Sequence, residues 1–244
     1  MEVIYEDNHL IAVNKNCHEI VQGDKTGDAP LSELLKAYLK EKYAKPGNVF
    51  IGVAHRLDRP VTGVVIFAKT SKSLSRMNEL FRSGTVKKTY WAVVKNCPPE
   101  HEGTLTHWLV RNEKQNKSYA YDNEKPNAKK AIMHYRLISR SDNYFLLEID
   151  LESGRHHQIR CQLARIGCPV KGDLKYGADH SNPDGGICLH ARSVDFIHPV
   201  TKEQIIITAN PPEDNLWKAL NEMLLRHCDT KGPRNDGEKL LIPN

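Results

Sequence analysis

Short apolar runs alternate with amphipathic segments along this chain. Two short strands are predicted at 3–5 and 10–13, because each is apolar and a polar stretch separates them. The segment 29–43 has leucines at helical spacing, with Pro30 at its start and a Pro-Gly pair beyond its end, which predicts an amphipathic helix. A continuous apolar run at 63–69 is typical of a strand buried on both faces.

The middle of the chain continues this alternation. A helix capped by Thr70 or Ser71 is predicted through about Phe81, followed by a strand at 89–94 that is rich in aromatic and β-branched residues. The polar, lysine-rich segment 112–130 predicts a loop or an irregular hairpin. Its two tyrosines either stack on bases or, as the more ordinary interpretation, cover a hairpin face.

The last third adds a hairpin, two strands and two helices. Because strands and helices interleave with hairpins, we predict an α+β fold with a mostly antiparallel mixed sheet flanked by helices. One catalytic domain is expected over 1–228 and a flexible tail over 229–244, where Gly, Pro and charge dominate. The elements are expected at 131–137 and 144–151 (hairpin), 155–166 (helix), 187–196 and 204–208 (strands) and 212–226 (helix).

Composition narrows the class of protein. The chain has 244 residues, 39% of them hydrophobic, and a mean hydropathy of −0.56, so it can bury a core but has no run that would span a bilayer. The acidic start of the chain does not resemble an export signal. Six cysteines occur without any C-x-x-C spacing, which argues against a zinc site or a disulfide framework. We therefore expect a soluble, cytoplasmic protein without a metal or a nucleotide cofactor.

Positive charge is concentrated in two segments. The net charge is only +5, but 54–95 carries +7, 155–177 carries +4, and the remainder carries −6. If the fold brings the two segments together, they form a basic cleft suited to a polyanion such as RNA. For either segment alone, a solvated helix face is the more ordinary interpretation.

One aspartate stands between two arginines in the segment 55–63, which reads H-R-L-D-R-P-V-T-G. A carboxylate held ionised by nearby cations, in a loop that enters a strand, can act as a nucleophile or a base. A salt-bridged structural aspartate is the alternative. On spacing alone, that alternative is favoured for Asp58.

Four motifs in the same order alter this weighting. The segment 55–69, read as H-R-L-D-R-x-x-T-G-x-x-x-x-A-K, resembles the active-site motif of the RluA-like family of RNA pseudouridine synthases. The segment 87–93 resembles that family's K-x-Y-x-A strand. The segment 154–177 is similar to its G-R-x-H-Q-I-R-x-H-L…G-x-P-I-x-G-D…Y-G block, and 189–191 matches its late L-H-A.

The resemblance extends from about residue 3 to residue 211, with small departures. Thr62 replaces the more usual serine, His156 the usual threonine and Gln162 the usual histidine. The resemblance implies the pseudouridine-synthase fold and isomerisation of uridine in a structured RNA. The family commonly carries an N-terminal S4 RNA-binding module, and the short stretch before the first predicted strand leads us to expect none here.

The resemblance also implies roles for individual residues. Asp58 is the expected nucleophile, Tyr90 the ring packed on the uracil and the proton acceptor at C5, and Arg160 the ion partner of Asp58. Five further residues are expected to contact RNA: Arg56, Arg59, Lys88, Arg155 and His157.

The chemistry of the reaction agrees with what the sequence lacks. Moving the ribose bond of uracil from N1 to C5 needs a nucleophile, rotation of the held base and loss of the C5 proton, but no redox centre. One rival is an RNA-binding or chaperone protein whose cleft no longer catalyses turnover. A zinc deaminase is the other, and the missing H-x-E and P-C-x-x-C signatures argue against it. We expect a monomer acting on ribosomal or transfer RNA, and the sequence leaves that choice open.

Overall fold

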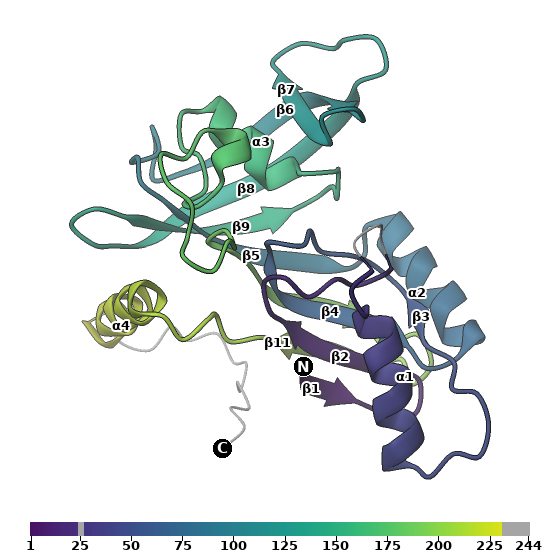
Figure 1. The fold of residues 1–244 in the computed structure, drawn as a ribbon. Helices are drawn as coiled ribbons and strands as arrows, with labels where there is room; N and C mark the ends of the chain where they lie inside the picture. Colours follow the sequence, from purple (N-terminus) through teal and green to yellow (C-terminus); the bar gives the residue numbers. More distant parts are fainter. Residues whose placement is uncertain (24–26, 231–244) are drawn as a thin grey trace.

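The computed structural model describes residues 1–23 and 27–230, and its fold is α+β (Figure 1). The described residues form four α-helices: α1 (Leu31–Lys42), α2 (Ser71–Ser83), α3 (Gln158–Arg165) and α4 (Asn215–Thr230). The strands are β1 (Glu2–Glu6), β2 (Leu10–Lys15), β3 (Gly52–Val53), β4 (Thr62–Ala68), β5 (Lys87–Val94), β6 (Glu102–Asn112), β7 (Lys117–Tyr121), β8 (Lys129–Arg140), β9 (Phe145–Leu151), β10 (Leu189–Ile197) and β11 (Gln204–Thr208).

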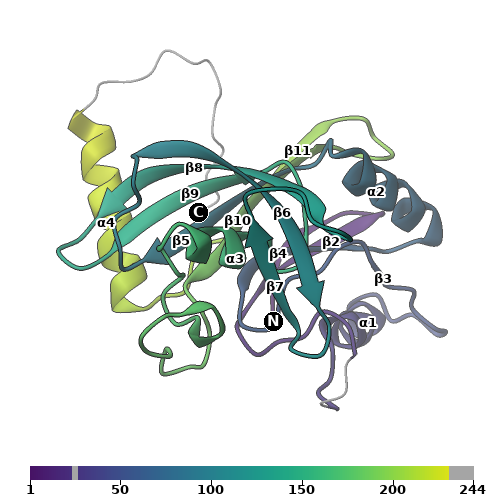
Figure 2. The ribbon, with the colours of Figure 1, turned by 90° about the horizontal axis from the view of Figure 1, so that it is seen from above.

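All eleven strands of the described chain belong to one sheet. The order along the sheet is β1-β2-β4-β10-β5-β9-β8-β6-β7, with β3 paired to β4 and β11 paired to β10. The pair β4–β10 is parallel and the other named pairs are antiparallel, so the predicted mixed, mostly antiparallel sheet is confirmed. Viewed from above, the sheet is curved and strongly twisted (Figure 2).

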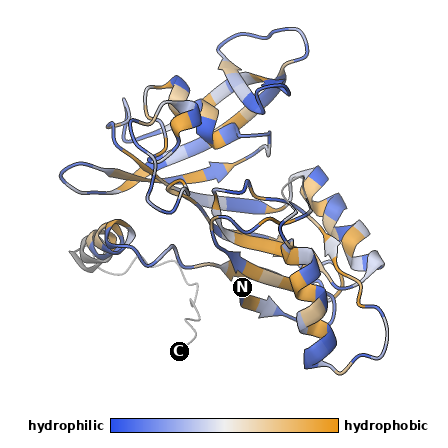
Figure 3. Ribbon diagram, viewed as in Figure 1, coloured by the Kyte–Doolittle hydropathy of each residue, from blue (hydrophilic) through white to orange (hydrophobic). Residues whose placement is uncertain are grey.

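The first half of the sheet is covered by one helix on each face. Its strand β4 has seven residues, all of them buried as predicted. Alternate residues of β4 point to opposite faces, so Val65 and Phe67 pack with the leucines of α1, while Val64 and Ile66 pack with Met77 of α2. In Figure 3 these strands are the most uniformly hydrophobic part of the ribbon. Thr70 caps α2 by accepting a hydrogen bond from the Ser73 N–H, which confirms one of the two predicted caps.

The second half of the sheet carries α3 on one face and α4 on the other. Ala92 and Val94 of β5 pack with Ile159 and Leu163 of α3. On the other face, Trp91 and Val93 of β5 pack against Trp217 of α4. The two halves of the sheet meet at β10, which lies between β4 and β5. Residues that enter from β4, β5 and α3 are therefore brought to one junction.

Several predictions from the pattern need correction. The helix predicted at 155–166 begins only at Gln158, because His157 adopts a left-handed conformation (φ 53°) that ends the preceding turn. Strand β6 was not predicted, and the segment 112–130 forms the hairpin alternative around β7, with both tyrosines exposed. Helix α4 includes residues 229–230 of the predicted tail. The rest of that tail lies outside the described residues.

In the described part of the chain, no helix combines the length and the apolar character needed to cross a membrane.

Candidate active site

Asp58 lies in the loop that connects β3 to β4, and a buried lysine fastens this loop. Lys15 is fully buried at the end of β2, and its Nζ donates to the backbone carbonyls of Asn16, Arg59 and Val61 at 2.9, 3.0 and 2.7 Å. Burial lowers the pKa of Lys15 to about 8. The Val61 N–H donates in turn to the Asp58 carbonyl at 3.0 Å. The backbone from Asp58 to Val61 is therefore held by hydrogen bonds on the C-terminal side of the carboxylate.

Asp58 meets α3 through one of its two carboxylate oxygens. Arg160 Nη1 donates to Asp58 Oδ2 at 3.0 Å, although the two residues are 102 positions apart, so the predicted ion pair is present. His157 Nε2 lies 3.3 Å from the same oxygen. Among the described residues, the other oxygen, Oδ1, has no partner, and 33% of the Asp58 side chain is exposed. One carboxylate oxygen is thus fixed while the other remains accessible.

Arg160 is itself held by a second carboxylate. Its Nε donates to Asp173 Oδ2 at 2.7 Å and its Nη2 to Asp173 Oδ1 at 2.9 Å, a bidentate pair with an aspartate that is only 1% exposed. The ring of Tyr176 lies 5.1 Å from the guanidinium carbon. Burial acts to lower the pKa of Arg160, but the hydrogen bonds and charges of Asp173 and Asp58 outweigh it and raise that pKa. Arg160 therefore remains a fixed cation.

His157 occupies a different place from the one predicted. We expected an RNA contact, but the residue is 8% exposed and lies behind Asp58, because its left-handed backbone turns the ring into the fold at the start of α3. Burial, together with the neighbouring Arg160, lowers the pKa of His157 to about 3 despite the opposing charge of Asp58. At neutral pH the imidazole is uncharged. It is a buried neighbour of the carboxylate and lies away from the surface.

Tyr90 stands on β5, on the sheet face that α3 covers. It is half-buried and packs against the cluster that contains Val61 and Ile159. Burial, and then the charge of Asp58, raise the pKa of its phenol. Within the described ranges its hydroxyl has no hydrogen-bond partner. A neutral phenol, whose hydroxyl has no other hydrogen-bond partner in the described structure, therefore lies near the Asp58 carboxylate.

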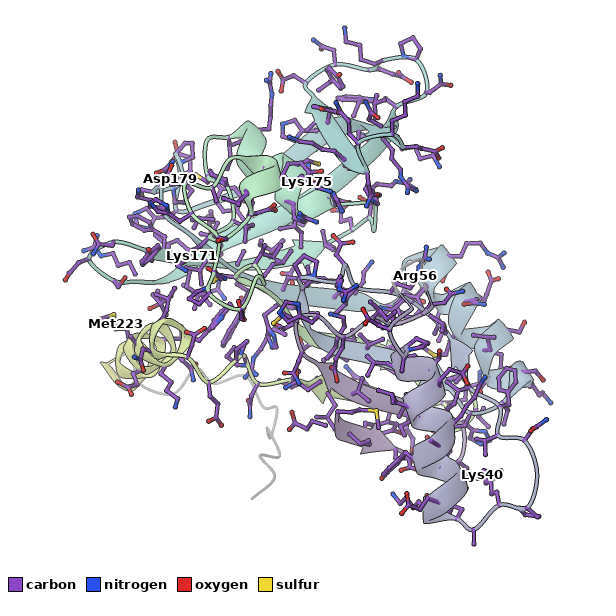
Figure 4. All side chains as sticks on the ribbon, in the orientation of Figure 1. Lys40, Arg56, Lys171, Lys175, Asp179 and Met223 are labelled. Atoms are coloured by element: carbon purple, nitrogen blue, oxygen red, sulfur yellow. The ribbon has the colours of Figure 1, made fainter. Side chains whose placement is uncertain are left out.

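The remaining predicted RNA contacts lie around this centre with unequal freedom. Arg56 and Arg155 are exposed, and Arg155 Nε donates to the Lys130 carbonyl at 3.3 Å. Lys88 is half-buried, and burial lowers its pKa. Arg59 pairs with Asp28 at the surface. Figure 4 labels Arg56 in the first half of the molecule and Lys175 beneath α3 in the second.

The two basic segments meet at this centre. Asp58 and Tyr90 belong to the segment 54–95, and Arg160 and Lys175 belong to the segment 155–177. The ion pair between Asp58 and Arg160 joins the two segments directly. The fold therefore brings the two basic segments together, as a surface for a polyanion requires, and they meet at Asp58.

Two of the three departures from the motif, Thr62 and Gln162, are buried, and His156 is half-buried. Thr62 Oγ1 is 2.8 Å from Nδ1 of the buried His190, and the side-chain amide of Gln162 donates to the Leu105 carbonyl at 3.1 Å. His156 stacks on His157 with a ring distance of 3.8 Å. These residues support the framework around Asp58 without replacing any of its contacts.

Two buried residues of the centre have no role that the sequence predicts. Asp173 and Tyr176 stood in the motif block, yet their partners, Arg160 and His157, could not be read from it. A lone acidic residue inside a segment of net charge +4 was the available signal for Asp173. In the described residues no cluster of His, Cys, Asp and Glu has the makeup of a metal site.

The sequence of the chain is similar to a protein family and to several known proteins. A family model described as RNA pseudouridylate synthase matches residues 9–165. The chain is 32% identical over 216 residues to a protein of Synechocystis named uncharacterized RNA pseudouridine synthase, covering 87% of this chain and 65% of that protein. It is 31% identical over 237 residues to ribosomal large subunit pseudouridine synthase D of Xylella fastidiosa, covering 91% and 70%. The chain thus spans about two thirds of these relatives.

Solved structures share the fold at lower identity. Human RNA pseudouridylate synthase domain containing 4 superposes with a TM-score of 0.74 at 22% identity, covering 92% of this chain and 93% of the other. Human RNA pseudouridylate synthase domain containing 1 gives 0.68 at 21% identity, covering 90% and 86%. The arrangement of sheet and helices is therefore common to these chains.

Proposed function

Because the chain belongs to the RNA pseudouridylate synthase family, as its motifs predicted, we propose that it isomerises uridine to pseudouridine in a structured RNA. The observation that carries the proposal is the state of Asp58. One of its oxygens is held by Arg160 and faces His157, and the other is open on a partly exposed side. A carboxylate fixed in this way can attack a sugar or a base without first reorganising.

The reaction conserves every atom of the nucleotide. The bond between N1 and the ribose C1′ breaks, a bond between C5 and C1′ forms, C5 loses a proton and N1 gains one. We assign the labilisation of the N1 bond to Asp58 as nucleophile, with Arg160 as its ion partner. No oxidant, reductant or energy source enters this balance, and the proposed enzyme needs no cofactor.

For Tyr90 the proposed contact with uracil is through the ring face. Packing against an aromatic ring holds a base while it turns and offsets part of the cost of extruding it from the RNA, which is a few kcal/mol. The raised pKa of Tyr90 means that a phenolate is scarce at neutral pH. We therefore propose stacking as its main role and favour it over the acceptance of the C5 proton as a phenolate.

The proposed substrate is ribosomal RNA. The relative from Xylella fastidiosa is named for the large ribosomal subunit, and transfer RNA is the alternative that the same assay can test. Phosphate contacts are assigned to Arg56, Lys88 and Arg155, with Arg59 beside them. We further propose that the protein acts in the cytoplasm as a monomer.

The test separates an enzyme from a protein that only binds RNA. Asp58→Asn keeps the shape of the side chain but removes the anionic nucleophile, so tritium release from [5-³H]uridine-labelled RNA should stop while affinity in a filter-binding titration stays within a few-fold. Asp142→Asn, at an exposed position between β8 and β9, is the matched control and should release tritium like the parent. Release by Asp58→Asn at the parent rate would exclude Asp58 as nucleophile. A parent that binds RNA but releases no tritium from ribosomal or transfer RNA would favour the binding protein.

A further inference from the structure

A chain of buried contacts connects the edge of the sheet to the carboxylate of Asp58. The backbone N–H of Ser118, on β7, donates to the hydroxyl oxygen of Tyr176 at 2.8 Å, and the Ser118 carbonyl lies 3.1 Å from the same hydroxyl. That hydroxyl lies 3.0 Å from His157 Nδ1. His157 Nε2 lies 3.3 Å from Asp58 Oδ2. One imidazole therefore stands between a tyrosine and the proposed nucleophile.

Counting protons leaves two arrangements for this chain. A neutral imidazole carries one N–H, and the Tyr176 hydroxyl has one proton to donate. In the first arrangement, Tyr176 donates to the Ser118 carbonyl, His157 Nδ1–H donates to Tyr176, and the bare Nε2 faces Asp58. In the second, Tyr176 donates to Nδ1 and the Nε2–H points at Asp58. Both arrangements use the Ser118 N–H in the same way.

Electrostatics favours the second arrangement. In the first, a nitrogen lone pair faces a carboxylate oxygen at 3.3 Å, and neither atom has a proton to share. In the second, Nε2 carries the proton, so that a donor and not a second lone pair lies 3.3 Å from the charged oxygen, at the cost of one hydrogen bond to the neutral Ser118 carbonyl. A hydrogen bond to a charged acceptor stabilises more than one to a neutral acceptor. The contact is longer than an ideal hydrogen bond, as catalytic contacts without substrate commonly are.

We propose that His157 is a positioning residue that holds Asp58 through Nε2–H, and that Tyr176 supports this tautomer by donating to Nδ1. The assignment rests on the proposed function of Asp58. Asp58 Oδ2 then has two donors, Arg160 Nη1 and His157 Nε2, which leaves Oδ1 directed toward the substrate. Because Tyr176 is itself held by the Ser118 backbone, the position of β7 sets the position of the imidazole.

The tautomer can be observed without any assay of activity. In a sample labelled with ¹⁵N-histidine, protonated and bare ring nitrogens have distinct chemical shifts, and loss of one set of signals in His157→Gln identifies this residue among the 12 histidines. The proposal expects a bare Nδ1 and a protonated Nε2 in the parent. In Tyr176→Phe, where Nδ1 loses its donor, the signal of the bare Nδ1 should shift toward that of a nitrogen without a hydrogen bond. A parent with a protonated Nδ1 would overturn the proposal, whether or not the protein makes pseudouridine.

Activity tests the consequence for Asp58. His157→Leu removes the donor and should lower kcat by roughly ten- to a hundred-fold with little change in KM, as expected for loss of a hydrogen bond to a charged group. His157→Gln retains a side-chain N–H and should recover most of the lost kcat. Both variants place an ordinary side chain on the same left-handed backbone, so strain is matched between them. Equal activity of the Leu and Gln variants would contradict the donor role.

Two control substitutions separate this effect from a general loss of packing. Tyr135→Phe removes another buried phenol, whose hydroxyl donates to the Glu100 carbonyl at 3.3 Å, and should leave kcat unchanged. His134→Leu removes a histidine that bonds Thr104 on the sheet face away from α3, and should also leave kcat unchanged. If both controls lost activity like His157→Leu, the effect would be structural and the proposal would be wrong. If the parent itself were inactive, the proposed function would fail and the tautomer would still be measured.

Discussion

Replacing Arg160 with Met should cost stability and activity through two different carboxylates. Arg160 is 5% exposed and supplies every side-chain hydrogen bond that the described structure gives Asp173, which is 1% exposed. Without the guanidinium, Asp173 is a buried charge with no partner, and breaking such a pair typically costs ~3 to 5 kcal/mol. Asp58 is more exposed and keeps its contact with His157, so its share of the stability loss is the smaller one.

A double substitution distinguishes the two carboxylates. Adding Asp173→Leu to Arg160→Met replaces the whole buried pair by apolar groups, which is often neutral for stability, so the free energy of unfolding in urea should return toward the parent value. Tritium release should stay lost, because Asp58 still lacks its cation. Lys95→Met, which breaks the exposed pair with Asp179, is the control and should change little. A single variant that unfolds like the parent, or a double variant that regains turnover, would refute these roles of Arg160.

Three further predictions concern the framework and the substrate. Gly63→Ala should destabilise the protein by at least about 2 kcal/mol in urea unfolding. Gly63 has φ 111°, and an added Cβ would lie 2.3 Å from the Ala191 carbonyl oxygen. An unchanged unfolding midpoint would contradict this prediction. Burial lowers the pKa of His55 and of His190 from 6.5 to about 4, so the unfolded chain binds more protons than the folded chain between these pH values. The free energy of unfolding should therefore fall as the pH drops from about 6.5 toward 4. Equal unfolding free energies at both ends of that range would contradict this prediction. RNA affinity should fall steeply with salt, by roughly 0.7 to 0.9 in the log-log slope for each phosphate neutralised, and a flat titration would argue against the two basic segments as the binding surface.

Local periodicity was sufficient for the parts of the fold that bury one regular face. The apolar run of β4 and the leucine spacing of α1 predicted both elements within one or two residues of their observed ends. Strand β6 escaped because its inward positions include His107, which is buried beside the amide of Gln162, and polar residues do not mark a core face. The late start of α3 depends on the left-handed backbone of His157, and no helix-capping signal in the sequence announces it.

The candidate active site also has a part that the sequence could predict and a part that it could not. The motif resemblance was enough to anticipate the pairing of Asp58 with Arg160, because each residue falls at a motif position whose role the family implies. It could not place His157 behind the carboxylate, since that depends on a hydroxyl of Tyr176 and a backbone segment of β7 from elsewhere in the chain. Contacts between elements far apart in sequence leave no spacing signal, so only the folded structure reveals them.

The insertion of β10 between β4 and β5 has a consequence for the order of events on the ribosome. Residues 62–94 leave the exit tunnel long before residues 189–197, yet β4 and β5 are joined only through the later strand. The nascent chain must therefore carry two open strand edges, one on each side of the future junction, until β10 arrives, and exposed edges invite pairing with other chains. We expect truncations that stop before residue 189 to aggregate or recruit chaperones. The carboxylate of Asp58 should then acquire its final surroundings only late in synthesis.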